Sequence, residues 1–302
     1  MDPYKRFEQY EGEKCWQAHI ADQNFVDDLK NSGLDIKEIT NIKISDFDFE
    51  YVPKEDKESC LEVKEFIEHH EWLGKLPNRP THRFVARYKG RLAGTVIMAT
   101  PNTFSFLLGK EYKDKEKLIS RGACISWSPK NLASWLIMQS INYMVKNTEF
   151  RYFTAYSDPE AKELGTIYQA CNFHYLGQTS GTSYQYLDPE FPEKGWFSDR
   201  EFRKKSKYLN YAVAIGLDKQ TWKSWQKKYS PDWDLVPPEI KTKIKAEEQR
   251  YRKSCMQRAV PAKHKYVYIL GATKSETKEL LKKFAKNSPN KQGLPYPKER
   301  GK

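Results

Sequence analysis

The strongest constraint on the fold is an alternation of strand-type and helix-type segments between residues 46 and 187. Residues 46–53 alternate polar and aromatic side chains, as a half-buried strand does. Residues 55–70 carry an apolar stripe at helical spacing and predict a helix. Two β-rich runs then meet at Lys89-Gly90, which is typical of a hairpin turn.

The second part of this region continues the alternation. It predicts a strand at 117–125, a helix after the break at 128–131, a strand at 150–157, a short helix at 165–172 and one or two strands within 173–187. Alternating strands and helices imply parallel neighbours, whereas the hairpin implies an antiparallel half. The sequence therefore predicts an α/β (α+β) fold: a mixed β-sheet flanked by helices.

Charge is concentrated at the end of the chain, which has a net charge of +12 overall. Residues 1–198 carry 25 basic and 29 acidic side chains, and residues 199–302 carry 27 and 11. The basic part is interleaved with Tyr208, Tyr211, Trp222, Trp225, Tyr229, Trp233, Tyr251, Tyr266 and Tyr268. Basic groups meet phosphates and aromatic faces stack on bases, so this composition points to nucleic acid. The alternative is that the aromatic side chains form the core of a small helical subdomain.

Cysteine usage and the N-terminus predict the compartment. The five cysteines are scattered and form no CxxC pair, so neither a zinc ribbon nor a disulfide framework is indicated. The first residues are charged, which argues against a signal peptide. No apolar run approaches the roughly 20 residues of a membrane-spanning helix. We expect a cytoplasmic protein without a membrane partner.

The order of elements resembles the acetyltransferase-type fold of the GNAT superfamily. Residues 165–177 (GTIYQACNFHYLG) are similar to the late helix and strand of that superfamily. Its acyl-CoA loop is rich in glycine, so that backbone amides can hold a pyrophosphate. The corresponding junction here, 125–134 (ISWSPKNLAS), contains no glycine. The donor is therefore left open: acyl-CoA, or another activated small-group metabolite.

Two segments resemble a narrower family, the Mom-like phage DNA-modification proteins. They are ISRGACISWSPKNLAS (119–134) and AYSDPEAKELGTIYQACNFHYLGQTSG (155–181), and the resemblance is clearest over 65–187. It implies a GNAT-like transferase that alters the exocyclic amine of adenine in double-stranded phage DNA, which protects that DNA from host restriction. For a phage-encoded enzyme, the compartment is the host cytoplasm.

The same resemblance implies four catalytic residues, Arg121, Ser134, Asp158 and Tyr168. Asp158 follows a strand and would accept a proton, and the Tyr168 phenol would donate one; otherwise they would be a turn former and a half-buried aromatic. Arg121 would hold the anionic donor, or form a surface ion pair with Glu116. Ser134 opens a helix and is either its N-cap or an anion contact, or both.

Other residues would complete the donor and acceptor sides. Lys130 and Asn131 precede the helix and would extend the cofactor-binding anion site formed with Arg121 and Ser134. His69, His70 and Trp72 follow the first amphipathic helix and are predicted to contact substrate, where Trp72 stacks on a flipped base or packs in the core. Adjacent histidines diverge on a helix, so no metal site is predicted.

We expect three regions: an N-terminal extension at 1–45, a GNAT-like catalytic core at 46–190 and a basic, mainly helical DNA-binding region at 191–302 packed on the core. A late strand at 265–271 would add to the main sheet or cap it.

Two other functions stay open: an N-acyltransferase for a protein or small amine, and a non-catalytic nucleic-acid-binding protein. The DNA sequence context and the oligomeric state, with a homodimer among the alternatives, are not set by the sequence.

Overall fold

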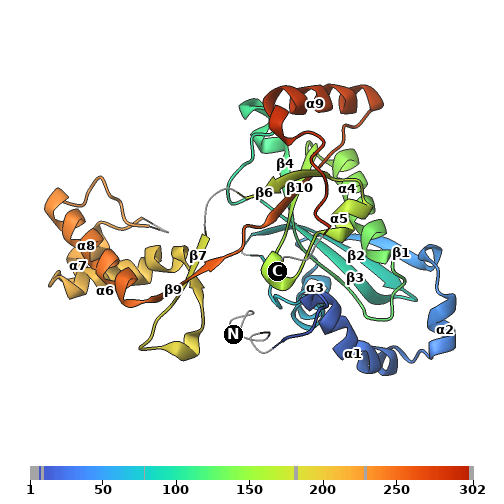
Figure 1. Cartoon of the computed structure of the whole chain (residues 1–302), viewed down its shortest axis with the longest axis horizontal. Coiled ribbons are helices and arrows are strands. Elements are labelled where there is room, and N and C mark those ends of the chain that lie inside the picture. Colours follow the sequence, from blue (N-terminus) through green and yellow to red (C-terminus); the bar gives the residue numbers. More distant parts are fainter. Residues whose placement is uncertain (1–6, 8–9, 78, 180–182, 228–229, 299–302) are drawn as a thin grey trace. The chain divides into compact units, whose positions relative to one another are not determined.

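The computed structural model describes residues 7, 10–77, 79–179, 183–227 and 230–298. The chain divides into two compact units (Figure 1). The larger unit comprises Glu11–Ser180 and Ala262–Lys302, and the smaller comprises Met1–Tyr10 and Gly181–Pro261. Each unit is described by itself.

Among the described residues of the larger unit, seven strands form one sheet in the order β1-β2-β3-β4-β5-β10-β6. The strands are β1 Phe47–Val52, β2 Pro80–Tyr88, β3 Arg91–Ala99, β4 Glu116–Cys124, β5 Tyr152–Ser157, β6 His174–Gln178 and β10 His264–Ile269. The helices are α1 Trp16–Ser32, α2 Ile36–Asn41, α3 Lys57–His70, α4 Leu132–Asn147, α5 Thr166–Ala170 and α9 Lys274–Asn287. The predicted mixed sheet flanked by helices is therefore confirmed.

The hairpin of β2 and β3 forms where the sequence predicts it. Lys89 and Gly90 both have positive φ, 49° and 79°, which is the backbone of a type I′ turn. A turn of this type matches the twist of the two strands, which pair antiparallel from Tyr88–Arg91 to Pro80–Ala99. The edge strand β1 then pairs antiparallel with β2.

The expectation of parallel neighbours throughout the second half is wrong. Parallel pairing in the sheet joins β4 to β5 and does not continue to β6. The C-terminal strand β10 lies between β5 and β6 and is antiparallel to both. Of the two predicted places for this late strand, it takes the one in the main sheet.

Helices cover the two faces of the sheet because strand side chains alternate in direction. On β3, Val96 and Met98 pack into a core cluster with α4, whereas Ile97 packs with α3. A third cluster forms where α9 covers β10 through Leu280 and Phe284. Full burial of an aliphatic or aromatic side chain of this size contributes about 1.5–3 kcal/mol, so these contacts hold the helices in place.

The smaller unit combines a short sheet with helices. Within its described residues, the strands are ordered β8-β7-β9, with bounds β7 Ser183–Leu187, β8 Phe197–Ser198 and β9 Met256–Val260. Its helices are α6 Lys205–Ala214, α7 Lys219–Ser224 and α8 Pro238–Ser254. β6 and β7, predicted as one or two strands within 173–187, are two strands that belong to different units.

Most aromatic residues of the basic region are core residues. Tyr208, Tyr211 and Trp222 are buried, and Trp225, Trp233 and Tyr251 pack partly buried against them. Tyr266 and Tyr268 lie on β10 in the larger unit, whereas Tyr229 lies outside the described residues. The aromatic side chains of the smaller unit therefore form the core of a helical subdomain, which was the alternative to base stacking. In the part of the chain that the structure describes, no helix combines the length and apolarity needed to cross a membrane.

Gly165, the residue before α5, tests how tightly this helix is fixed. Its φ is +67°, and a Cβ there would lie 2.5 Å from the fully buried Tyr266 ring. We expect Gly165→Ala to cost roughly 1–2 kcal/mol for the left-handed backbone and about 1–3 kcal/mol more for overpacking. Gly33→Ala is the matched control, because its φ is +66° and nothing lies within 4 Å. Urea unfolding measures both; equal losses would show that Tyr266 does not restrict this position.

Candidate functional site

The site forms where the parallel strands β4 and β5 separate. Their pairing ends at Ile119–Ala155, although β4 continues to Cys124 and β5 to Ser157. The carboxyl ends of the two strands are therefore not bonded to each other. Ligand-binding groups in open α/β sheets gather at such ends. Arg121 lies on the unpaired part of β4, and Asp158 directly follows β5.

Asp158 is buried and fixed at both carboxylate oxygens. Its Oδ1 accepts a hydrogen bond from the Glu160 backbone N–H at 3.1 Å, and its Oδ2 forms an ion pair with Lys263 Nζ at 2.7 Å. The turn role considered for this residue is therefore real, since Asp158 precedes the short 3₁₀ turn at Pro159–Ala161. The same geometry holds the carboxylate at the end of β5.

Glu163 connects Asp158 to Trp72. Its Oε2 accepts from the Asp158 backbone N–H at 3.1 Å, and its Oε1 accepts from the Trp72 indole N–H at 3.0 Å. Burial raises the pKa of Glu163 to about 7, and the charge of Asp158 adds to this rise against the lowering effect of the hydrogen bonds. Glu163 therefore exchanges its proton near neutral pH.

Glu71 is a second buried carboxyl group at this place. It is 6% exposed, and its Oε2 accepts from the Gly74 backbone N–H at 3.0 Å. Burial raises the pKa of Glu71 to about 7; the charge of Glu163 raises it further, and Arg121 lowers it. Two carboxyl groups that titrate close to neutral pH are typical of sites that transfer protons.

The charges of Glu71 and Glu163 act on Tyr168, and Arg121 acts on both Tyr168 and Glu71. Burial raises the pKa of Tyr168 above its usual range, as do the charges of Glu163 and Glu71, whereas Arg121 lowers it. The phenol therefore stays protonated at neutral pH and is available as a proton donor. The Arg121 Nε–H donates to the Lys75 carbonyl at 3.0 Å. No Arg121–Glu116 ion pair is found among the described residues, in contrast to the surface role considered for Arg121.

The start of α4 is the second part of the site. Asn131 is the N-cap, so Ser134 is the third residue of the helix and not its N-cap. The Ser134 Oγ donates to the Asn131 carbonyl at 3.0 Å. Lys130 and Asn131 are exposed, and the first turn of α4 contains no acidic residue. Such a helix start favours an anion.

Ser134 is joined to the helix that carries Tyr168. The Cys171 thiol donates to the Ser134 carbonyl at 3.6 Å, and Cys171 follows Tyr168 by one turn. The structure thus brings Arg121, Asp158 and Tyr168 together with the carboxyl groups and places Ser134 beside α5. The assignment of catalytic and cofactor-binding roles to these residues, and to Lys130 and Asn131, stays a prediction.

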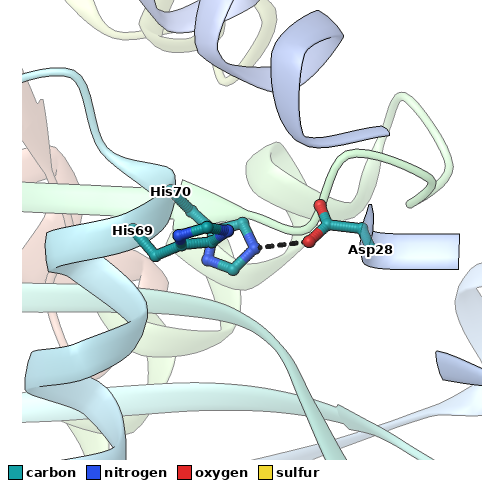
Figure 2. Close-up of side chains that lie close together, drawn as sticks. All are labelled: Asp28, His69 and His70. Carbon is teal, nitrogen blue, oxygen red and sulfur yellow. Dashed lines mark hydrogen bonds and ion pairs between the residues drawn. The ribbon is translucent and has the colours of Figure 1, made fainter. Parts of the chain in front are cut away.

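The three predicted substrate contacts have different surroundings. Trp72 is buried and packs edge-to-face on Trp16, with ring centroids 5.2 Å apart, so its packing role is realised. His70 is almost fully buried and bonded to Asp28 (Figure 2), whereas His69 is exposed. The two imidazole rings do not diverge, since their centroids lie 4.6 Å apart. A direct contact of these residues with substrate stays a prediction.

Three site residues were not predicted from the sequence: Glu71, Glu163 and Lys263. Each lies among other charged residues, as Glu163 does in DPEAKELG, and nothing local marks Glu71 or Glu163 as buried. Lys263 reaches Asp158 because β10 inserts beside β5. The one available signal was the position of Glu71 beside His69, His70 and Trp72, which were singled out.

The sequence matches the model of the Mom protein family over residues 56–251, about two thirds of the chain. No curated protein matches it significantly. Solved structures with similarity include a putative acetyltransferase from Salmonella typhimurium with acetyl-CoA, at 11% identity and a TM-score of 0.33, covering 44% of this chain and 82% of that chain. An IAA acetyltransferase from Bacillus cereus has 12% identity and a TM-score of 0.35, covering 74% and 99%. A tandem GNAT protein from the clavulanic acid biosynthesis pathway has 10% identity and a TM-score of 0.38, covering 75% and 99%.

Replacement of Glu71 tests the electrostatics of the site. The folded chain keeps the Glu71 proton up to about pH 7, whereas the unfolded chain releases it near the ordinary pKa of 4.5. The folded state binds more protons in this window, so stability falls as the pH rises through it. Glu71→Gln removes this loss. We expect a Tm at least about 2 °C above that of the parent at pH 8, and an equal Tm at pH 4.5. Glu68→Gln, at an exposed neighbouring position, is the control. If Tm depended on pH in the same way in Glu71→Gln and in the parent, the raised pKa of Glu71 would be contradicted.

Proposed function

This chain belongs to the Mom protein family, and from this membership we propose that it transfers a small acyl- or alkyl-type group to the exocyclic amine of adenine in double-stranded DNA. The observation that carries the proposal is the convergence of Arg121, Asp158 and Tyr168 where β4 and β5 separate. These three positions are among those that the resemblance to the family singles out. A phage source, protection of DNA from host restriction and a cytoplasmic location belong to the same proposal.

The chemistry requires a proton acceptor, because the lone pair of the adenine amine is delocalised into the ring and the amine is a weak nucleophile. Asp158 would accept the proton as the new bond forms. Glu163 lies next to Asp158, and Glu71 interacts in turn with Glu163. The pKa of about 7 for both glutamates suits proton exchange at neutral pH. The protonated Tyr168 phenol would donate to the leaving group.

The donor is proposed to bear an anionic group that Lys130, Asn131, Ser134 and Arg121 hold at the start of α4. The acid-free first turn and the exposed Lys130 fit such a group. The preceding loop does not fit the glycine-rich pyrophosphate cradle. It has no glycine, and its Ser126 N–H is already bonded to Asp28 Oδ2 at 3.1 Å. Acyl-CoA and another activated metabolite therefore both remain candidates for the donor.

DNA is the proposed acceptor because of the basic region. An enzyme that acts on a base amine must extrude the base from the duplex, and basic side chains hold the flanking phosphates. In the smaller unit, Lys204, Lys205 and Lys223 line a concave surface together with Ser206, Leu209 and Gln226. All three lysines are exposed. We assign phosphate contact to this surface.

Asp158→Asn is the test of catalysis. The variant keeps the size of the side chain but removes the proton acceptor, so we expect modified deoxyadenosine to fall roughly 100-fold or more. The measurement is mass spectrometry of nucleosides from plasmid DNA of expressing cells. Glu160→Gln, on the same turn, is the matched control and should keep its modification level.

Three outcomes are informative. Full modification by Asp158→Asn would remove Asp158 from the mechanism. Unchanged nucleosides with the folded parent, together with turnover of an acyl donor on a peptide or polyamine, would replace the proposal by an N-acyltransferase for those substrates. DNA binding without any modification would favour a non-catalytic DNA-binding protein.

The phosphate surface is tested by Lys223→Ala. Loss of one phosphate contact should weaken DNA binding for all sequences and lower the slope of log affinity against log salt by about 1. Lys54→Ala serves as the control because this exposed lysine lies outside the basic region and pairs with Glu55. The measurement is a fluorescence titration of a duplex at several salt concentrations. An unchanged slope would place the phosphate contacts elsewhere.

A further inference from the structure

Helix α9, on the outside of the larger unit (Figure 1), carries a row of lysines that the proposed transfer reaction does not use. They recur every four residues along one side of the helix, at Lys274, Lys278, Lys282 and Lys286. All four are exposed. On the other side of α9, Leu280 and Phe284 are buried in the core cluster shared with β6 and β10. This packing fixes the helix so that the lysine row faces solvent.

The lysine row has no acidic partners of its own. α9 contains five lysines and two glutamates. Glu276 is engaged elsewhere, since it pairs with Arg151 Nε at 2.7 Å and accepts from the Ala272 N–H at 2.6 Å. Within the described residues, no lysine of the row forms an ion pair, either with Glu279 or with another acid. Four unpaired positive charges therefore lie side by side on one helix.

The other long basic helix, α8, is built differently. Its Lys245 pairs with Glu248 at 2.7 Å, and its Arg250 pairs with Glu247 at 2.6 Å. Opposite charges three or four residues apart stabilise a helix, whereas like charges four residues apart destabilise it. A helix that is merely solvated alternates the two signs, as α8 does. α9 keeps three successive like-charge spacings, and a bound polyanion would remove their repulsion.

The lysine row matches a nucleic-acid backbone in length as well as in charge. Four residues of an α-helix advance about 6 Å, so the row spans about 18 Å. One strand of duplex DNA carries a phosphate for about every 3.4 Å of the helix axis. A backbone that follows the row therefore offers it several phosphates. Lysine ammonium groups contact phosphates as flexible point charges and do not read the bases.

We propose that the lysine row of α9 binds the phosphate backbone of double-stranded DNA. The choice of DNA among polyanions rests on the proposed function, but the surface is separate from the transfer site. Asp158 pairs with Lys263 just before β10 begins, whereas α9 packs on the part of β10 that ends at Ile269. Six strand residues separate these places by about 20 Å. The row also lies beyond residue 251, where the match to the family model ends.

The test is a fluorescence titration of the full-length chain with a duplex, and with a single-stranded RNA, at several salt concentrations. The row variant combines Lys274→Gln, Lys278→Gln, Lys282→Gln and Lys286→Gln. Loss of four phosphate contacts should weaken duplex binding at least about tenfold and lower the slope of log affinity against log salt by about 3 to 4. Its Tm should not fall, because the change removes like-charge repulsion.

Two controls separate the row from charge in general. Lys283→Gln changes the one lysine of α9 outside the row, whose Nζ lies 5.1 Å from the Tyr112 ring centroid. A charge-matched variant changes four exposed lysines in the N-terminal part of the chain. It combines Lys37→Gln, Lys43→Gln, Lys54→Gln and Lys64→Gln. Both controls should keep the salt slope within about 1 of the parent.

Equal losses in the row variant and the charge-matched variant would overturn the proposal, because net charge alone would then explain them. An unchanged affinity of the row variant for the duplex would also overturn it, and a loss confined to RNA would make RNA the partner instead. The titration does not depend on catalysis. Row-dependent duplex binding without modified nucleosides would keep the row and refute the proposed transfer, whereas full modification with an unchanged salt slope would do the reverse.

Discussion

The separation of β4 from β5 is the constraint on which the site depends. Their parallel pairing stops at Ile119–Ala155, and β5 continues beside β10 on its other edge. The last residues of β4 continue beside β3, where Arg121 pairs with Ile97. The end of β4 is thus hydrogen-bonded to β3 and the end of β5 to β10, whereas the two ends are not hydrogen-bonded to each other. If the pairing of β4 and β5 continued to their ends, the strands would leave no gap between Arg121 and Asp158.

Beside the ends of these strands the site holds buried ionisable groups that would destabilise an ordinary core. Glu71 and Glu163 are both placed where burial raises their pKa to about 7. A structure keeps such groups when each has its own backbone donor, and here Gly74 and Asp158 provide the N–H groups. The Trp72 indole adds a third donor. The cost in folding stability is the physical reason to regard this place as functional.

Local patterns predicted the elements well, since periodicity and turn residues are local properties. The Lys89-Gly90 turn, the helix predicted at 55–70 (observed at 57–70) and the strand predicted at 150–157 (observed at 152–157) were all found this way. The position of β10 was not fixed, because strand pairing across more than 100 residues leaves no local pattern. Lys263 was missed for the same reason, since it reaches Asp158 only through β10. The roles of Glu71 and Glu163 depend on burial, which a charged side chain does not reveal in a sequence.

The N-terminal helix explains how a glycine-free junction after β4 is held. A glycine-rich loop would leave its amides open to a phosphate. Here the Ser126 N–H is bonded to the Asp28 carboxylate, and the Trp127 indole donates to Ser32 Oγ at 2.9 Å. The Asp28 carboxylate thus binds a backbone amide of the kind that binds a phosphate in a glycine-rich loop. In the proposed function, an anionic donor would then bind at the exposed start of α4, at Lys130 and Asn131, and α1 would restrict the donor to that place.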